Sequence, residues 1–443
     1  MIGILLDILY AAGLAASSPV WLYRMIRHGR YRRDVGQRFG AAPVRYGLQP
    51  ILWVHGVSLG EVNAARSLVT ELHRQLPDYR VVVSTTTDTG MDAAQRLFAP
   101  DHLVFRFPLD FTWAVGRALS RLRPDLVVLM EGEVWPNFLA ACNRRAIPVV
   151  VVNARLSADK GYPRYKKLGP LAARLFNRLA AVGAQDESYA RRYRDLGVAP
   201  AKVHVTGMMK FDSAHVADRV DGQEALAAAM GLQAHDQLIV AGGTGDGEEK
   251  LLLEQFVSLK KAFPRARLAL VPRKPERFEE TARLIESSGF ACLRRSRRPD
   301  ATTEPADPQA VILGDTMGEL RKFYALAACV FVGRSLANMG GSDMIEAAAL
   351  GKPVAFGPHT FNFPQADALA AHGCARVADA DALGRQVAAW LADPAAATVA
   401  AKQAQDYIRS QLGATARNVE MICHLLHRVP TADGGAATDE IAD

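Results

Sequence analysis

Residues 340–353 combine residue types and spacing suited to binding a nucleotide. The segment follows an apolar stretch, residues 329–332, and leads into a helix-like pattern. Gly340 and Gly341 allow a tight turn before a helix whose N-terminal N–H groups and dipole favour an anion. Glu346, one turn into that helix, offers a carboxylate for ribose hydroxyls. The segment predicts a nucleotide site, and it also fits an ordinary strand–loop–helix connection.

An acid in the first half, Glu61, follows a predicted strand, residues 51–55, at the start of a helix. A carboxylate at the carboxyl end of a buried strand could take a proton from an acceptor hydroxyl. Ser58-x-x-Glu61 also matches a capping box, in which the glutamate reaches back to the start of its helix. The sequence leaves both interpretations open.

A second acidic segment follows the predicted strand 125–130 and contains Glu131 and Glu133. Two acids at the end of a buried strand are costly unless they are hydrogen-bonded or functional. We expect one to supply negative charge at the next helix N-terminus and the other to face the predicted cleft. A lone lysine such as Lys210 is usually a solvated surface group, but its place just before a predicted interdomain break strengthens the case for a functional role.

Several loops of the second half also follow predicted strands. Residues 242–249 are glycine-rich but lack the lysine and spacings of nucleotide fingerprints. Arg273 ends another strand, where its guanidinium can fork onto a phosphate. Residues 314–320 form a third strand-to-helix turn, and no Asp-x-Asp metal motif accompanies these loops. Together they indicate a nucleotide-donor domain.

The basic run at residues 294–298 has no interleaved aromatic residues. We interpret it as a solvated loop in preference to a lipid or phosphate patch. It gives little support to nucleic-acid binding.

The composition limits the class of protein. A chain of 443 residues is too long for one compact domain and fits two. Its five cysteines are scattered without a CxxC pair, which argues against a disulfide framework or structural zinc. The net charge of +7 suggests an acidic partner.

The N-terminus points to a membrane. Residues 2–23 are largely apolar apart from Asp7, and arginines follow. The stretch is long enough to span a bilayer, with the basic cluster as its cytoplasmic flank. Asp7 and the small residues 11–18 weaken that case and leave a helix lying in the interface as the alternative. The stretch lacks a basic region before it, so a cleaved signal peptide is not expected.

The order of elements predicts an α/β protein. Short β-branched runs alternate with amphipathic stretches in two successive series. We expect two Rossmann-like doubly wound domains facing a cleft, with ligands at the carboxyl ends of the strands. The predicted parts are a membrane anchor with its basic flank (1–33), a first domain (34–215), a second domain (216–430) and a disordered tail (431–443).

Together these segments resemble the Kdo (3-deoxy-D-manno-octulosonic acid) transferases of lipopolysaccharide assembly. The resemblance covers nearly the whole chain. It implies a GT-B, inverting, metal-independent glycosyltransferase that moves Kdo from CMP-Kdo to the lipid A precursor lipid IVA at the cytoplasmic face of the bacterial inner membrane. The motifs that carry it are SLGEVNAA, EGEVWPN, NARLS, TGMMKFD, PRKPERF, GDTMGEL, GGSDMIEAAALGKP and GPHTFNF.

The resemblance also assigns roles by motif position. Glu61 matches the catalytic base, and Glu131 and Lys210 match residues that stabilise the transition state. No metal or cofactor is implied beyond the donor substrate CMP-Kdo, and the implied partners are lipid IVA and the membrane surface, not nucleic acid. The implied CMP-binding residues are Pro272, Arg273, Met317, Gly318, Glu319, Asp343, Met344, Ile345 and Glu346.

The sequence departs from the family pattern at several of these loops. The family's His-Asn-Pro-Leu-Glu is here Ser342–Glu346, Gly132 replaces a threonine, and Lys274 replaces a histidine. The aspartate at 343 loses an amide donor and adds negative charge beside a nucleotide phosphate. Two alternatives follow: a GT-B transferase for another CMP-activated ulosonic acid or glycolipid acceptor, and a non-catalytic membrane-bound protein that binds nucleotide or glycolipid.

Overall fold

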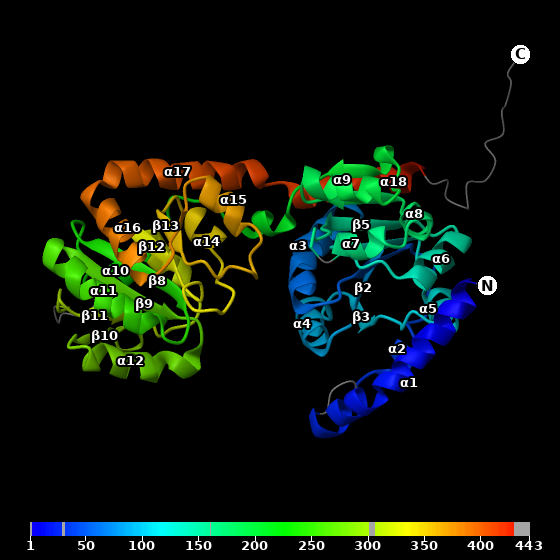
Figure 1. Ribbon diagram of the computed structural model, residues 1–443, viewed down its shortest axis with the longest axis horizontal. Helices are drawn as coiled ribbons and strands as arrows, with labels where there is room; N and C mark the ends of the chain where they lie inside the picture. Colours follow the sequence, from blue (N-terminus) through cyan, green and yellow to red (C-terminus); the bar gives the residue numbers. More distant parts are fainter. Residues whose placement is uncertain (1, 29–31, 160, 301–305, 429–443) are drawn as a thin grey trace, which may run out of the picture. The chain divides into compact units, whose positions relative to one another are not determined.

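The computed structural model describes residues 2–28, 32–159, 161–300 and 306–428, which form two compact units (Figure 1). The first unit comprises Met1–Ser213 and Leu412–Asp443, and the second comprises Ala214–Gln411. The chain therefore returns to the first unit at Leu412, whereas the prediction from sequence was that residues 216–430 all belong to the second domain. The predicted disordered tail, residues 431–443, lies outside the described residues.

The first unit is a doubly wound α/β fold around a seven-stranded parallel sheet of order β3-β2-β1-β4-β5-β6-β7. Its elements are α1 (Ile2–His28), α2 (Val35–Arg38), β1 (Ile51–His55), α3 (Leu59–Gln75), β2 (Arg80–Thr85), α4 (Asp88–Phe98), β3 (Leu103–Arg106), α5 (Thr112–Leu122), β4 (Leu126–Met130), α6 (Pro136–Arg144), β5 (Val149–Ala154), α7 (Gly161–Lys166), α8 (Pro170–Phe176), β6 (Ala181–Ala184), α9 (Glu187–Asp195), η1 (Pro200–Lys202), β7 (Val203–Val205), η2 (Met209–Ser213) and α18 (Ala414–Arg428).

Helices cover both faces of this sheet. Trp53 and Val127 point into a core under α5, α6, α8 and α9, and Leu52 and Val128 point into a second core under α3, α4 and α18. The strands β4 and β5 are buried throughout, which explains their unbroken apolar sequences. The last helix, α18, packs on α3 (Figure 1).

The second unit has a seven-stranded parallel sheet of order β10-β11-β9-β8-β12-β13-β14. Its elements are α10 (Gln223–Ala229), β8 (Gln237–Thr244), α11 (Glu248–Ala262), β9 (Ala266–Pro272), η3 (Pro275–Arg277), α12 (Phe278–Ser287), β10 (Cys292–Arg294), η4 (Arg295–Arg297), β11 (Val311–Leu313), α13 (Leu320–Leu326), β12 (Cys329–Val332), α14 (Ile345–Ala348), β13 (Val354–Phe356), α15 (Ala366–Ala371), β14 (Ala375–Arg376), α16 (Ala380–Ala392) and α17 (Pro394–Gln411).

In the first sheet the direction of winding reverses between β1 and β4, and in the second between β8 and β12. Ligands of doubly wound sheets bind beyond the carboxyl ends of the strands at such reversals. Glu61 follows β1 and Glu131 follows β4, so these two acids flank the reversal in the first sheet. The predicted pair of doubly wound units is confirmed.

Candidate active site and nucleotide-binding loops

Glu61 lies in the first turn of α3 and forms the predicted capping box. Its backbone N–H donates to the Ser58 hydroxyl at 3.4 Å, and its carboxylate accepts from that hydroxyl at 3.0 Å and from the Val57 amide at 2.8 Å. The residue is only 8% exposed. Burial raises the pKa of Glu61 to about 7, and the charge of Glu131 adds to the shift, whereas the Val57 and Ser58 hydrogen bonds oppose it. The Glu61 carboxylate therefore caps α3 and also has a pKa suited to accepting a proton near neutral pH.

Glu131 directly follows β4 in a left-handed backbone conformation, φ 58°. Its amide donates to the Val152 carbonyl at 3.0 Å, and its carboxylate pairs with the Arg155 guanidinium at 2.8 Å. Burial raises the pKa of Glu131, while the charges of Arg155 and Lys210 oppose that rise. A non-glycine residue at positive φ is strained and is held there by its surroundings. In this conformation the Glu131 carboxylate pairs with Arg155, and the charge of Lys210 acts on it.

Lys210 sits in the short helix η2, which neighbouring side chains hold in place. The Asn153 side-chain oxygen accepts from the Met209 amide at 3.1 Å. Asp212 accepts from the backbone amides of Gly413, at 2.7 Å, and Thr415, so it caps α18. The return of the chain to the first unit thus fixes the turn that carries Lys210.

The structure brings the three predicted catalytic residues together at the carboxyl edge of the first sheet. The charge of Glu131 acts on Glu61, and the charge of Lys210 acts on Glu131. Arg155 also belongs to this cluster, and sequence reasoning did not single it out. The motif NARLS, which contains Arg155, could have drawn attention to this residue. Only the tertiary structure shows that its partner is Glu131.

The prediction that one of the two acids of the Glu131 segment supplies charge to the next helix is wrong. Asp110 does so: its carboxylate accepts from the amides of Asn137, at 3.0 Å, and Phe138, at 2.8 Å, in the first turn of α6. Glu133 lies at the surface but is partly covered by its neighbours, and this partial burial raises its pKa. Asp110 is remote in sequence, so no local pattern reveals the cap.

His55, at the end of β1, is a poor alternative base. Its Nδ1 lies 2.9 Å from the Ser84 hydroxyl and 3.1 Å from the Ser84 carbonyl, and its ring stacks on Phe107. Burial lowers the pKa of His55 to about 3. An imidazole that weakly basic accepts protons poorly at neutral pH, so His55 is not a rival to Glu61 as a candidate base.

In the second unit, predicted nucleotide loops follow the neighbouring strands β11, β9, β8 and β12. Pro272 is the buried last residue of β9, and Arg273 is exposed immediately after it. Within the described part of the chain, the Arg273 guanidinium makes no hydrogen bond or ion pair. It is a cation available to an anionic ligand.

The interpretation of residues 294–298 as a solvated loop is wrong for its first two arginines. Arg294 pairs with Asp315 at 2.7 Å, and Arg295 pairs with Glu319 at 2.8 Å. These four side chains are at most 14% exposed. Although burial alone would raise it, the pKa of Glu319 is lowered to about 2 by Arg295, Thr316 and Lys322. These two ion pairs join residues 294–295 to residues 315–319, and we call this pair of contacts the brace.

This brace bears on the predicted nucleotide role of residues 317–319. The Glu319 carboxylate is occupied by Arg295, so the backbone is left as the part that could meet a ligand. Gly318 has φ 85°, and Met317 is 68% exposed. No backbone–backbone hydrogen bond from the amides of 317–319 is among those that the described residues make. The segment can present these amides to a phosphate.

The glycine-containing loop of residues 340–346 differs from its prediction in one respect. Gly340 and Gly341 both have positive φ, as a tight turn requires, but the helix that follows, α14, is a single turn of four residues. A helix this short has little macrodipole, so its attraction for an anion is weak. The loop must bind a nucleotide mainly through side chains and individual N–H groups.

Side chains in this loop have distinct placements. Met344 and Ile345 are buried, at 0% and 3% exposure, so their side chains serve the core. Asp343 accepts from the Ile345 amide at 3.0 Å. Burial and the charge of Asp343 raise the pKa of Glu346, whereas Arg321 opposes the shift. Glu346 remains the half-buried carboxylate suited to ribose hydroxyls.

Hydrogen bonds connect the loops that follow β8 and β12, the two strands at the winding reversal of the second sheet. The Ser342 hydroxyl donates to the Gly243 carbonyl at 2.9 Å. The carboxylate of Glu248, 1% exposed, accepts from the amides of Gly245, at 2.9 Å, and Ser335, at 2.9 Å. The glycine-rich segment 242–249 thus anchors the loop after β12, and its glutamates are structural.

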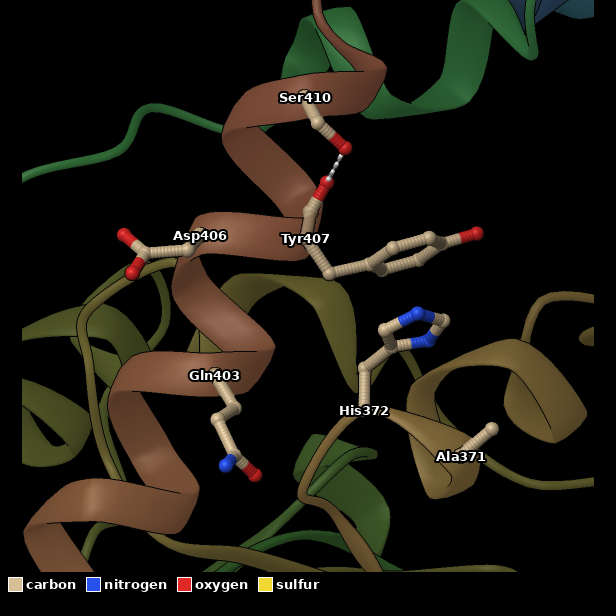
Figure 2. Close-up of a pocket in the computed structure, with 6 residues that line it drawn as sticks. All are labelled: Ala371, His372, Gln403, Asp406, Tyr407 and Ser410. Atoms are coloured by element: carbon tan, nitrogen blue, oxygen red, sulfur yellow. Dashed lines mark hydrogen bonds between the residues drawn. The ribbon is translucent and has the colours of Figure 1, made fainter.

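A surface pocket elsewhere in the second unit does not coincide with these loops (Figure 2). There His372 of the segment after α15 stacks on Tyr407 of α17, with ring centroids 4.1 Å apart. The pocket is lined by Ala371, His372, Gln403, Asp406, Tyr407 and Ser410. The predicted site residues are not among them. In the part of the chain that the structure describes, no group of three His, Cys, Asp or Glu side chains is arranged to hold a metal ion.

Comparison with known proteins gives a consistent result. Residues 33–213 match the family model described as 3-deoxy-D-manno-octulosonic-acid transferase. A transferase of that name from Bordetella pertussis is 36% identical over 432 residues, 93% of this chain and 96% of the relative. Another from Haemophilus influenzae is 33% identical, covering 77% of this chain and 78% of the relative.

Solved structures share the fold. UDP-GlcNAc 2-epimerase from Neisseria meningitidis is 17% identical with a TM-score of 0.56, covering 85% of this chain and all of that one. MurG from Acinetobacter baumannii is 18% identical with a TM-score of 0.52, at the same coverage. Together with the two parallel sheets, these likenesses show the GT-B class.

Proposed function

The chain belongs to the 3-deoxy-D-manno-octulosonic acid (Kdo) transferase family and is a glycosyltransferase of lipopolysaccharide biosynthesis, and we propose that it moves Kdo from CMP-Kdo to lipid IVA. The observation that supports this most is the buried Glu61 beside Glu131 at the winding reversal of the first sheet, with its pKa raised to about 7. A buried carboxylate in a ligand-binding position, with a pKa near neutral pH and a second acid next to it, is the combination expected of a general base.

In the proposed reaction, Glu61 takes the proton of the acceptor hydroxyl. The acceptor oxygen then attacks the anomeric carbon of Kdo while the bond from that carbon to the CMP phosphate breaks, and CMP departs with the electron pair. The configuration inverts because the attack is a single displacement. Positive charge that develops on the sugar is stabilised by Glu131, whose pairing with Arg155 keeps its carboxylate fixed.

The leaving phosphate gains negative charge, and we assign its binding to cations and amides of this chain. Arg273 can fork onto the phosphate oxygens, and the amides of 317–319 can donate to them. Lys210 carries further positive charge toward the transition state. CMP bears one phosphate, so the proposed reaction needs neither a metal-bound diphosphate nor a cofactor. The Glu346 carboxylate would accept hydrogen bonds from the ribose hydroxyls.

We place the protein at the cytoplasmic face of the bacterial inner membrane, where a lipid acceptor would be met. The support is α1, which has a mean hydropathy of 1.5 over its most apolar window and is long enough to cross a bilayer. Arginines follow it, which suits a negatively charged lipid surface.

The direct test incubates the purified full chain in detergent with CMP-Kdo and lipid IVA and weighs the lipid product by mass spectrometry. We expect Kdo-sized additions, and their loss in Glu61→Gln. The amide keeps an acceptor oxygen for the Val57 N–H, so this variant should still fold. Additions that persist in Glu61→Gln would remove the assigned base.

The Asp343 departure motivates a second candidate, a transferase that uses another CMP-activated ulosonic acid. Asp343 adds a negative charge near Glu346, where the family has a neutral amide. The same assay with other CMP-activated ulosonic acids separates the two. Additions from such a donor, and none from CMP-Kdo, would favour this candidate, and CMP binding without product from either would favour a non-catalytic binder.

A further inference from the structure

Arg334 lies two residues beyond the end of β12, at the winding reversal of the second sheet, and outside every motif singled out from the sequence. β12 and β8 are neighbouring strands there (Figure 1). The Arg334 backbone has φ 60°, in the left-handed region that an L side chain adopts only at a cost in energy. Non-glycine residues persist in that region where their surroundings fix them, and they gather at ligand-binding sites.

Two hydrogen bonds fix the Arg334 backbone in this conformation. Its amide donates to the buried Glu248 carboxylate in the first turn of α11, and its carbonyl accepts from the Gly341 amide at 2.7 Å. Glu248 lies in the segment after β8, and Gly341 belongs to the predicted nucleotide loop of residues 340–346. Arg334 is therefore held between two loops at the edge of the sheet where ligands of this fold bind.

The Arg334 side chain lies against the loop after β8. A Cβ atom on Gly245 would lie 3.0 Å from Arg334 Cγ and 2.5 Å from the Met339 sulfur, so only glycine leaves room for these side chains. The Arg334 Nη2 donates to the Met339 carbonyl at 3.3 Å. The side chain is thus folded onto the carboxyl edge of the sheet, and the residue is half-buried.

The Arg334 guanidinium makes no ion pair with any residue that the structure describes. Its one side-chain hydrogen bond within those residues is to the Met339 carbonyl, and its Nε is buried without a partner among them. Other partly buried arginines of this unit pair with acids, among them Arg277, Arg294 and Arg295. Because a partly buried charge without a counter-charge costs energy, the guanidinium of Arg334 indicates an anionic ligand.

We propose that Arg334 binds an oxyanion of the donor, either the phosphate of CMP or the carboxylate of the sugar acid. Since the identity of the donor rests on the proposed function, this assignment adds a residue to that same reaction. A CMP-activated ulosonic acid carries its carboxylate and its phosphate on the same carbon atom, so the donor presents two adjacent oxyanions. A guanidinium group can fork onto either one.

Two arginines at this edge of the second sheet match the two oxyanions. Arg273 follows β9 and Arg334 follows β12, and β8 lies between these strands. Arg273 is exposed, whereas Arg334 is half-buried and its backbone is held from both sides. Arg334 therefore has the more rigid position, which suits the recognition of one particular oxyanion.

The test measures the binding of cytidine, CMP and CMP-Kdo to the purified full chain in detergent by calorimetry, without lipid acceptor. Arg334→Gly removes the guanidinium and should weaken CMP binding about tenfold or more if the phosphate is the ligand, with cytidine binding unaffected. If the carboxylate is the ligand, only CMP-Kdo binding should weaken by that factor. Unchanged affinities for CMP and CMP-Kdo, or an equal loss for cytidine, would overturn the assignment.

These measurements need no turnover, so the two proposals can fail separately. Binding of CMP or CMP-Kdo that depends on Arg334, without transfer to lipid IVA, would overturn the proposed function alone. Failure of the unchanged protein to bind either CMP or CMP-Kdo would overturn both.

A matched control removes the same charge from the opposite edge of the sheet. Arg265 is exposed and immediately precedes β9, at the amino end of that strand. Arg265→Ala should leave the three affinities unchanged. An equal loss in Arg265→Ala and Arg334→Gly would reduce the effect to general electrostatic attraction and overturn the assignment.

Unfolding in urea separates ligand binding from a structural role of Arg334. Glycine adopts positive φ without steric cost, so Arg334→Gly should unfold at the same urea concentration as the unchanged protein or at a higher one. A side chain that served stability would give the opposite result. A lower midpoint together with unchanged affinities for CMP and CMP-Kdo would assign Arg334 to the fold and overturn its role in binding.

Discussion

Burial raises the pKa of Glu61, which follows β1, and the negative charge of Glu131, which follows the adjacent strand β4, adds to that rise. Two acids at the ends of adjacent strands thus have different tasks. Glu131 is paired with Arg155. Glu61 has hydrogen-bond donors but no cationic partner among the described residues, and burial leaves it basic near neutral pH.

The pH dependence of the reaction follows from this pair. A base must be deprotonated, so kcat/KM should rise as pH passes through about 7, the pKa of Glu61. Glu131→Gln removes a charge that raises this pKa, and the midpoint should move to lower pH. A pH–rate series for both proteins measures the shift. An unmoved midpoint in Glu131→Gln would show that the charge of Glu131 does not contribute to the pKa of the titrating group.

The same pKa predicts an effect on stability. Glu61 binds its proton more tightly in the folded protein, where its pKa is about 7, than in the unfolded chain, where its pKa is about 4.5. The free energy of unfolding should therefore fall as pH rises from about 4.5 to 7. Glu61→Gln cannot titrate and should lose this component. Urea unfolding of both proteins at several pH values measures it, and parallel pH curves would contradict the raised pKa.

Arg273 and Lys274 offer a matched pair for the nucleotide loop. Both are exposed, and only Arg273 is assigned to the phosphate. Arg273→Ala should raise KM for CMP-Kdo by about tenfold or more, because a charge-assisted hydrogen bond contributes about 1.5–3 kcal/mol. Lys274→Ala, the control, should change KM much less. Steady-state kinetics over a donor series distinguishes them, and equal effects would indicate general electrostatic attraction.

Gly132 and Tyr193 are sterically coupled. A Cβ on Gly132, which has φ 116°, would lie 2.2 Å from the Tyr193 hydroxyl oxygen. Gly132→Ala should therefore destabilise by about 2–5 kcal/mol, from backbone strain together with overpacking. In the double variant with Tyr193→Phe the clashing oxygen is gone, and part of the loss should be recovered.

Tyr193→Phe alone should be neutral or stabilising. The Tyr193 hydroxyl is buried and has no hydrogen-bond partner among the described residues, a situation that costs about 1–3 kcal/mol. Denaturant unfolding of the two single variants and the double variant gives the coupling. Strictly additive effects would show that the loop moves away from the tyrosine.

Arg295 and Arg297 test the brace in the second unit. Arg295→Ala leaves Glu319, 14% exposed, without its main cation and should cost about 2–3 kcal/mol. Arg297→Ala, an exposed neighbour, is the control. The folded pKa of Glu319 lies near 2, below its ordinary 4.5, so its stabilisation is present above about 4.5 and is lost as pH falls toward 2.

The gap in unfolding free energy between Arg295→Ala and the unchanged protein should therefore narrow over that acid range. Thermal or urea unfolding from pH 6 to 3 measures it. A gap of constant size would mean that Arg295 acts through packing and not through the carboxylate.

The sequence alone determined the local elements of this protein. The unbroken apolar runs of β4 and β5 identify buried parallel strands, and Ser58 and Glu61 identify the start of α3, because periodicity and capping depend only on neighbours in the chain. The resemblance carried by its motifs gave the family. Because Glu61 and Glu131 each follow a predicted strand, the sequence also predicted that both lie at the carboxyl edge of one sheet.

Tertiary structure decided the partners. Asp110 caps α6, Arg295 pairs with Glu319, and Asp7 of α1 accepts a hydrogen bond from the Thr112 amide, in each case across a long stretch of chain. Such pairs depend on which segments the fold brings together, and a charged residue carries no local mark of its partner. The same holds for α18, whose return to the first unit is set by the core it covers on α3.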